Sequence, residues 1–100
     1  MKIKLFQIVP EKDTENVMFC DYDFTVKHGG VKREIYNKVF DGELPVKGPD
    51  DVFQIFNTKL PDGYTERSMS VSDVVFCEGL GTFFCDRYGW QGLEGDVFND

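Results

Sequence analysis

The segment from Arg67 to Trp90 constrains the fold of this 100-residue chain more than any other part of it. It holds two dense apolar runs, at 74–77 and 82–85, which are separated by the glycine-containing link EGLG. Two such runs joined by a short glycine-bearing link are typical of a β-hairpin. We therefore expect a C-terminal hairpin over 74–86, entered from the serine-rich sequence RSMSVSD and left through the aromatic sequence YGW.

Two strands are expected in the first half of the chain. Residues 2–9 alternate charged and apolar side chains and then become fully apolar, which favours a strand with one buried face at its start. Pro10 ends this strand, because proline cannot donate to a sheet ladder. A second strand is expected at 35–40, followed by Asp41-Gly42 as turn residues.

Two helices are also expected. Pro49 suits a first helical turn, and the two acidic residues after it complement the positive end of the helix dipole, so a main helix is predicted over 49–60. Its expected apolar face consists of Val52, Phe53, Ile55, Phe56 and Leu60. A short helix is predicted over 21–28, begun by Asp21 and ended by two glycines. The aromatic and β-branched residues in that short segment also tolerate a strand.

The predicted fold class is α+β, in one small domain. One hundred residues leave little room for a second core, and fifteen aromatic residues supply large apolar areas to a small one. We expect a mostly antiparallel sheet of about four strands, the helix at 49–60 and the possible short helix at 21–28. The domain is expected to occupy residues 1–93, and residues 94–100 are expected to form a frayed acidic tail.

The cysteine content bears on the redox state of the chain. The chain has three cysteines: Cys20, Cys77 and Cys85. An odd number argues against a secreted disulfide scaffold. If the hairpin turn centres on Gly79-Leu80, Cys77 faces Thr82, and only a turn centred on Gly81 places the sulfurs of Cys77 and Cys85 opposite each other. We expect free, reduced, buried thiols. With no signal-peptide pattern and no run of eighteen apolar residues, a cytoplasmic protein is expected.

Charge is unevenly distributed along the chain. The net charge is −7, with +1 in residues 1–40 and −8 in residues 41–100. A nucleic-acid-binding protein normally shows a basic stripe, so direct binding to nucleic acid is not expected. An acidic surface suits solubility or a partner that is itself basic.

One motif points to catalysis. The sequence VMFCDYDFT resembles the DxDxT signature of haloacid dehalogenase-type phosphatases, in which Asp21 would be the nucleophile and Asp23 the acid/base. That chemistry requires the carboxyl ends of a parallel, doubly wound sheet, which 100 residues cannot readily supply. The single histidine, His28, has no visible orienting group for a Cys–His pair, and the cysteines lack zinc-ligand spacing. We therefore expect no enzyme, no metal and no cofactor, with the phosphatase as a remote alternative.

The serine-rich sequence SMSVSD at 68–73 can be interpreted in two ways. Serine and aspartate side chains commonly accept hydrogen bonds from nearby backbone N–H groups, which would fix the chain entering the hairpin. The same side chains beside Arg67 would also suit a ligand. The backbone role is the expectation preferred here.

The complete pattern resembles the YodL-like domain family, small domains of Firmicutes proteins often encoded on plasmids, conjugative elements and phages. The most specific part is SMSVSDVV at 68–75. A starting strand, the strand sequence YNKVFDGEL at 36–44, an acidic helix near 50–57 and the ending YGW complete a match over about 2–93. The family strand that often reads YYVD is here FFCD at 83–86, so no tyrosine role transfers to it. The resemblance implies a small α+β domain without an established catalytic residue.

Function is expected to follow from this resemblance together with the acidic charge. The first hypothesis is a non-enzymatic protein-binding module from a mobile element, which acts against host defence by engaging the basic nucleic-acid-binding surface of an enzyme such as a CRISPR effector or a restriction enzyme. The expected binding residues are Asp73, Glu78, Asp86, Tyr88 and Trp90. The alternative is a regulatory or scaffolding domain that docks on a larger protein, or that forms a homodimer through an edge strand at residues 2–9.

Overall fold

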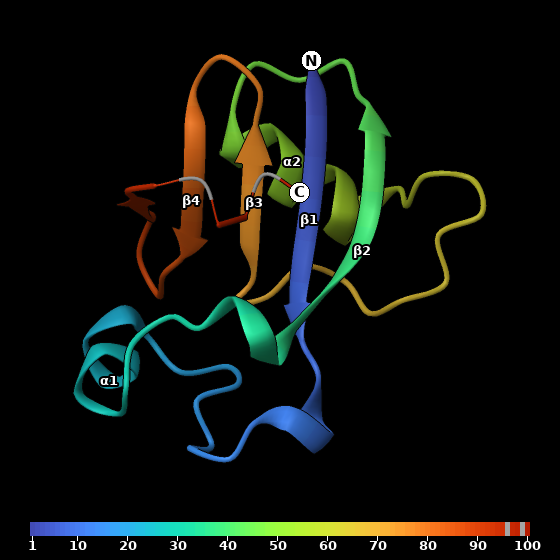
Figure 1. Ribbon diagram of the computed structural model, residues 1–100. Helices are drawn as coiled ribbons and strands as arrows, with labels where there is room; N and C mark the ends of the chain where they lie inside the picture. The colour runs from blue at the N-terminus through green and yellow to red at the C-terminus, as the bar shows by residue number, and fades with distance from the viewer. Residues whose placement is uncertain (96, 99) are drawn as a thin grey trace.

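A computed structural model describes residues 1–95, 97, 98 and 100, and within them five strands form one antiparallel sheet. The order across the sheet is β2-β1-β3-β4-β5 (Figure 1). The strands are β1 (Lys2–Ile8), β2 (Tyr36–Glu43), β3 (Val74–Cys77), β4 (Gly81–Cys85) and β5 (Trp90–Leu93). The α-helices are α1 (Tyr22–Lys27) and α2 (Pro49–Thr58), and short 3-10 turns occur at Pro10–Lys12 and Arg33–Ile35. None of the helices in these residues has the length and apolar character needed to cross a bilayer.

Strand β1 lies inside the sheet, between β2 and β3, and is antiparallel to both. The predicted strand at residues 2–9 is therefore confirmed, but its predicted role as an exposed edge is wrong. Its sequence explains this position, because from Leu5 to Ile8 every side chain is buried on one face or the other. The sequence of a strand that is covered on both faces is a nearly continuous apolar run rather than an alternating pattern.

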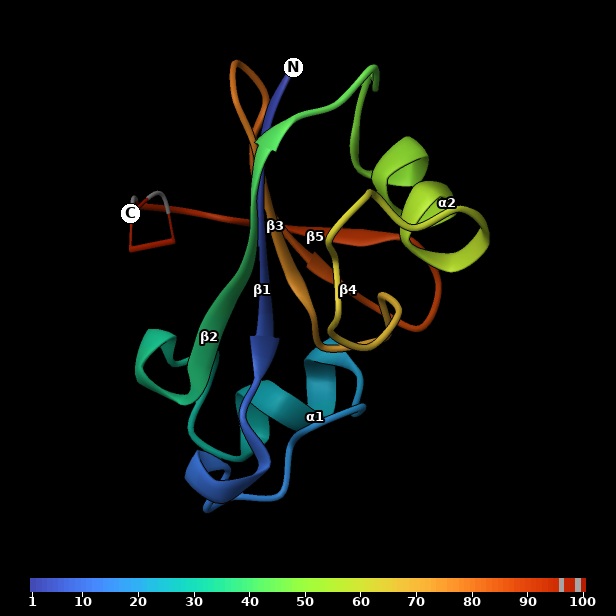
Figure 2. The same ribbon diagram turned by 90° about the vertical axis from the view of Figure 1, so that its right-hand side faces the viewer.

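Each face of the sheet has its own core. Helix α2 packs on one face, where Val52 and Phe56 meet Ile3, Leu5 and Val75. The C-terminal segment lies on the opposite face, and α1 and the loop before it lie at one end of the sheet, where Tyr22 and Val17 pack in the second core (Figure 2). The buried members of that second core are Phe6, Ile8, Val17, Tyr36, Val74, Phe84 and Phe98. Successive strand residues point to opposite faces, so Val74 and Val75 serve different cores.

Helix α1 begins where the sequence predicts. The side chain of Asp21 accepts a hydrogen bond from the backbone N–H of Phe24 at 2.9 Å, which satisfies a donor at the helix start. Gly29 and Gly30 follow the helix with φ angles of 104° and 85°, a conformation that favours glycine. The α-helix is thus preferred over the strand that the same residues tolerate.

Two predicted boundaries are wrong. Asp41-Gly42 does not form a turn but continues β2, opposite Lys4 and Ile3 of β1. Asp41 is held there by ion pairs with Lys2 at 2.9 Å and Lys38 at 2.8 Å, so strand pairing overrides local turn preference. Helix α2 ends at Thr58 rather than at residue 60, and Leu60 is exposed instead of belonging to the buried face.

The hairpin at 74–86 is confirmed, but its register differs from the expected one. Cys77 pairs with Gly81 rather than with Thr82, so the loop has one residue more than the turn on Gly79-Leu80 that we considered. Gly79 and Gly81 carry φ angles of 85° and 125°, which lets the chain reverse in this longer loop. All three cysteines are free, as predicted. Cys77 and Cys85 are buried, whereas Cys20 is only half-buried.

The end of the chain differs most from expectation. Residues 90–93 form a fifth strand, β5, where only an aromatic exit and a sheet of about four strands were predicted. The predicted frayed tail at 94–100 is wrong at Phe98, which is buried, and at Asp100, which pairs with Arg33 at 2.9 Å. Asp96 and Asn99 lie outside the described residues.

Candidate protein-binding surface

The five predicted binding residues fall in three separate places. Asp86, Tyr88 and Trp90 gather around the turn between β4 and β5. Glu78 is exposed in the β3–β4 turn, which lies at the opposite end of β4 (Figure 1). Asp73 is fully buried at the start of β3. Only the first group therefore lies together, at one turn.

Trp90 joins this surface to helix α2. Its indole Nε1–H donates a hydrogen bond to Asp50 Oδ1 at 2.8 Å, and its ring meets the edge of Phe53 with centroids 6.4 Å apart. A hollow of about 190 Å³ lies beside these rings, and its walls also include Asp86 and Arg87. The hollow thus combines aromatic faces with two carboxylates and one guanidinium group.

Tyr88 is the most exposed large side chain near this hollow, with 90% of its surface accessible. Tyr88 lies between Asp86 and Gly89, whose backbone groups are joined by a 3.0 Å hydrogen bond from Asp86 N to Gly89 O. Gly89 has a φ of 86°, so the turn depends on glycine there. A turn that carries an uncovered aromatic ring suits contact with another molecule.

Asp86 fixes the base of the same turn. Partial burial acts to raise the pKa of Asp86, but hydrogen bonds from the backbone N–H groups of Tyr22 at 3.0 Å and Arg87 at 2.8 Å outweigh it and lower the pKa below its ordinary value. The carboxylate therefore stays ionised at neutral pH. Asp86 Oδ1 accepts both of these hydrogen bonds. The carboxylate therefore holds the turn in place and also contributes a negative charge to the surface.

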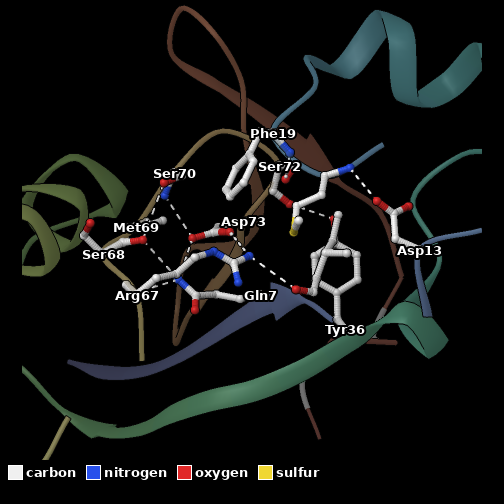
Figure 3. Close-up of polar contacts among 12 residues, drawn as sticks. Gln7, Asp13, Phe19, Tyr36, Arg67, Ser68, Met69, Ser70, Ser72 and Asp73 are labelled. Carbon is white, nitrogen blue, oxygen red and sulfur yellow. Dashed lines mark hydrogen bonds and ion pairs between the residues drawn. The ribbon is translucent and has the colours of Figure 1, made fainter. Parts of the chain in front are cut away.

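Asp73 belongs to a buried polar cluster behind the serine-rich segment (Figure 3). Its Oδ2 accepts hydrogen bonds from Ser70 N and Gln7 Nε2, both at 2.9 Å. Arg67 approaches the other oxygen, Oδ1, at 3.6 Å. These contacts tie the end of β1 to the start of β3 and confirm the backbone role that the sequence indicates. With 0% of its surface exposed, Asp73 is not available to a protein partner, contrary to the predicted binding role.

Phe19 closes the cluster on the outside. The guanidinium of Arg67 lies 5.2 Å from the centroid of the Phe19 ring, which is a cation–π contact. Phe19 has a φ of 67°, and its N–H donates to the hydroxyl of Ser72 at 2.9 Å. Ser72 itself has a φ of 80°, and its carbonyl accepts from the hydroxyl of Tyr36 at 2.7 Å. Phe19 and Ser72 are non-glycine residues with positive φ angles, which is a strained conformation. The hydrogen bonds of the cluster offset this strain.

Burial dominates the acid–base properties of the cluster. Desolvation raises the pKa of Asp73 to about 7, although the bonds from Ser70 and Gln7 and the charge of Arg67 act to lower it. Desolvation likewise raises the pKa of Tyr64 to about 12 and of Cys85 to about 12, and the nearby Asp73 charge adds to both shifts. Neither the tyrosine nor the thiol therefore ionises near neutral pH.

Stability is expected to depend on pH through Asp73. The folded protein holds this proton up to a pKa of about 7, whereas the unfolded chain releases it near 3.8, so the unfolding free energy falls as pH rises through that window. The contribution is fully present below about pH 4 and is lost above about pH 7, with an upper bound of roughly 4 kcal/mol. Urea titrations at several pH values check this. The difference in stability between the parent and Asp73→Asn should shrink or reverse with rising pH, and a constant difference would contradict it.

Two residues of the catalytic alternatives, Asp21 and His28, have structural partners. Asp21 caps α1, and Asp23 lies exposed in the first turn of that helix. The sheet around them is antiparallel and provides no carboxyl edge of parallel strands of the kind that the DxDxT chemistry requires. His28 stacks on Phe24 with ring centroids 3.9 Å apart. In the described residues, no group of three or more His, Cys, Asp or Glu side chains is placed to hold a metal ion.

Sequence reasoning missed two members of the surface, Asp50 and Phe53. It assigned Asp50 to the dipole of α2 and Phe53 to the buried face of that helix. Phe53 is partly exposed, and Asp50 is the acceptor for Trp90, forty residues away. The hydrophobic periodicity of α2 gave a usable signal, because Phe53 follows the buried Val52 and so lies about 100° around the helix from it.

Comparison with known proteins gives one match. The family model described as the YodL-like domain matches residues 2–95, which is nearly the whole chain. The chain therefore belongs to the YodL-like domain family. A search of curated proteins and a search of solved structures each found no match.

Proposed function

We propose that this YodL-like domain is a non-enzymatic protein-binding module that engages a basic, nucleic-acid-binding surface of another protein. The contact surface consists of Asp50, Phe53, Asp86, Tyr88 and Trp90, here called the aromatic–acidic surface. The observation that carries the proposal is the hollow lined by Asp50, Asp86 and the half-buried Trp90, next to a turn on which Tyr88 is 90% exposed. The proposal assigns no catalytic residue and no cofactor.

The chemistry of the aromatic–acidic surface favours a basic partner. Tyrosine and tryptophan are enriched among the residues that dominate binding energy at protein interfaces. Carboxylates beside them attract lysine and arginine side chains, and the net charge of −7 adds a long-range attraction to any basic channel. Arg87, the one cation among the described residues that line the hollow, lies 3.6 Å from Asp21 and is partly neutralised by it.

The class of partner follows from the same charges. Enzymes that cleave DNA or RNA bind phosphates through basic channels, and an acidic domain can compete with nucleic acid for such a channel. The mobile-element setting implied by the family resemblance fits an inhibitor of host defence enzymes, including CRISPR effectors and restriction enzymes. This proposal concerns a protein partner rather than nucleic acid itself.

Charge reversal at the aromatic–acidic surface is expected to weaken inhibition. Asp50→Lys should lower the affinity for a sensitive nuclease by about tenfold or more, because a carboxylate opposite a basic group is replaced by a like charge. Raising the salt concentration from about 0.05 M to about 0.5 M should weaken binding of the parent steeply, since screening shortens the range of these attractions. DNA cleavage by a panel of purified CRISPR nucleases and restriction enzymes, measured against protein concentration, provides the test.

A matched control separates this surface from net charge alone. Asp62→Lys makes the same change in net charge at an exposed residue in the loop after α2, away from the aromatic–acidic surface. It should leave inhibition within about twofold of the parent. Equal losses from both variants would assign the effect to overall charge, and salt-independent binding would contradict the electrostatic basis of the proposal. Absence of inhibition across the panel would count against the anti-defence role.

A further inference from the structure

The two edges of the sheet are built differently. Strand β2 is protected: its pairing with β1 shifts between Leu5 and Phe6, which leaves Val39 as an extra residue, and charged side chains project along it. Lys38 and Asp41 pair on that strand at 2.8 Å. Bulges and charges of this kind prevent a sheet edge from pairing with another chain.

Strand β5 has none of these protections. Its sequence, WQGL, contains no charge and no proline, and its register with β4 is regular from Trp90 to Leu93. It ends the sheet, with a neighbouring strand on one side only. The open backbone of such an edge is a template for an incoming strand.

Gly92 widens the access to this edge. Its backbone does not adopt a conformation that requires glycine, and a Cβ placed there would meet no atom within 4 Å. The absence of a side chain at this position leaves the face next to Trp90 bare. Gly92 therefore leaves open space beside the strand, and its backbone conformation does not require glycine.

A hollow lies on each side of β5. On the α2 face is the hollow of about 190 Å³, whose walls include Asp50, Phe53, Asp86 and Trp90 and also Arg87, which pairs with Asp21 at 3.6 Å. On the opposite face, where Leu93 packs into the second core, is a hollow of about 230 Å³. Its walls are mainly apolar, from Tyr22, Val26, Val31, Leu93 and Val97, with one carboxylate, Glu94. Trp90 and Leu93 are three residues apart, which places them on opposite faces of the strand.

The two hollows differ in the side chain that each would accept. Carboxylates and aromatic rings on the α2 face suit the stem and cation of a lysine or arginine. The valines on the other face suit an aliphatic side chain, and Val26 and Val97 leave about half or more of their surface uncovered, at 50% and 60% exposed. An extended chain beside β5 would direct alternate residues into the two hollows.

We propose that β5 binds an extended segment of the partner as an added strand, with a basic and an aliphatic residue three positions apart in that segment. Main-chain hydrogen bonds along β5 would supply affinity, and the two hollows would supply specificity. This inference rests on the proposed function for the identity of the partner and adds how the partner is held. It commits to a partner segment rather than to a second copy of this chain.

Synthetic peptides test the spacing directly. Two peptides of identical composition carry one lysine and one valine among threonines, three positions apart in one and two positions apart in the other. Titration of the isotope-labelled protein should shift amide resonances of residues 90–93 and give about tenfold or more tighter binding for the three-position peptide. Equal affinities, or shifts centred on another strand, would overturn the proposal.

Two substitutions on α1 make a matched pair. Val26→Asp places a charge in the apolar hollow and should reduce binding of the three-position peptide by about tenfold. Phe24→Asp changes an exposed apolar residue on the same helix outside that hollow and should leave the peptide affinity within about twofold. Equal losses would overturn the assignment of the hollow.

Further readouts separate this inference from the proposed function. Inhibition of a nuclease that persists in Val26→Asp, with no competition from the three-position peptide, would overturn edge binding and leave the proposed function standing. Peptide binding without inhibition of any nuclease would support edge binding and count against the anti-defence role. A mass that doubles with concentration in the parent but not in Val26→Asp would replace the partner segment with a second copy and overturn the proposal.

Discussion

Asp73→Ala is expected to lower the free energy of unfolding by about 3 kcal/mol at about pH 4, where the contribution of Asp73 is largest, because it leaves the buried polar partners of this side chain without hydrogen bonds. Ser70 N and Gln7 Nε2 each lose the carboxylate oxygen that they contact at 2.9 Å. Arg67 loses its partner at 3.6 Å, and its Nε is already a buried atom without a hydrogen bond. Leaving polar groups buried and unpaired costs more than the hydrogen bonds contribute when made.

Chemical denaturation of the parent and two variants measures this effect. Asp73→Asn keeps the size of the side chain and one acceptor oxygen, so its loss should be clearly smaller than that of alanine at low pH. Asp62→Ala removes an exposed carboxylate and should change stability by less than about 0.5 kcal/mol. A loss below about 1 kcal/mol for Asp73→Ala would show that the cluster rearranges or takes up water to satisfy its polar groups.

The polar cluster around Asp73 also shows which contacts could be predicted from the sequence and which could not. SMSVSD at 68–73 correctly predicted local backbone hydrogen bonding, because serine and aspartate act over a few residues. The partner of Asp73 across the sheet is Gln7, which lies 66 residues earlier in the chain. A glutamine within the apolar run of β1 was the available signal, since a buried polar side chain needs a partner. Nothing in the sequence identified that partner.

Local sequence patterns predicted the presence of helices and strands better than the residues at which they begin and end. Apolar runs located β1, β3 and β4, and the aspartate cap located α1, because these signals depend on neighbouring residues. Asp41-Gly42 has strong turn chemistry, yet Lys2 holds Asp41 within β2 from the adjacent strand. Strand β5 carries only two half-buried residues, so its apolar pattern was too short to predict. Its pairing with β4 depends on the turn at Gly89.

The aromatic–acidic surface was predicted only in part, because local sequence patterns do not identify contacts between residues that are far apart in the chain. Asp86, Tyr88 and Trp90 lie close together in the sequence and are brought together by one turn. Asp50 and Phe53 reach them from α2, and only the packing of this helix on the sheet brings them to Trp90. Glu78 is as acidic as the others but lies at the far end of β4, and Asp73 is buried. Charge alone therefore did not distinguish the surface from its surroundings.

Phe98→Ala is expected to destabilise the domain by about 3 kcal/mol or more, the usual cost of emptying a buried phenylalanine site. Phe98 is 2% exposed and contacts two rings edge-on, with centroids 5.1 Å from Phe6 and 5.2 Å from Tyr36. Arg33 lies over both Phe6 and Phe98, at 4.8 Å and 5.9 Å, and also pairs with Asp100. Phe98 thus completes the second core.

Val97→Ala provides the matched control, because Val97 is adjacent in sequence but 60% exposed, and it should change stability by less than about 0.5 kcal/mol. Asp100→Asn weakens only an exposed ion pair and should cost about 0.5 kcal/mol. Denaturant unfolding followed by circular dichroism measures all three variants. If Phe98→Ala were as stable as Val97→Ala, the tail would contribute nothing to the core. If only Phe98→Ala is weakened, the cooperative unit extends past residue 95, where the family match ends.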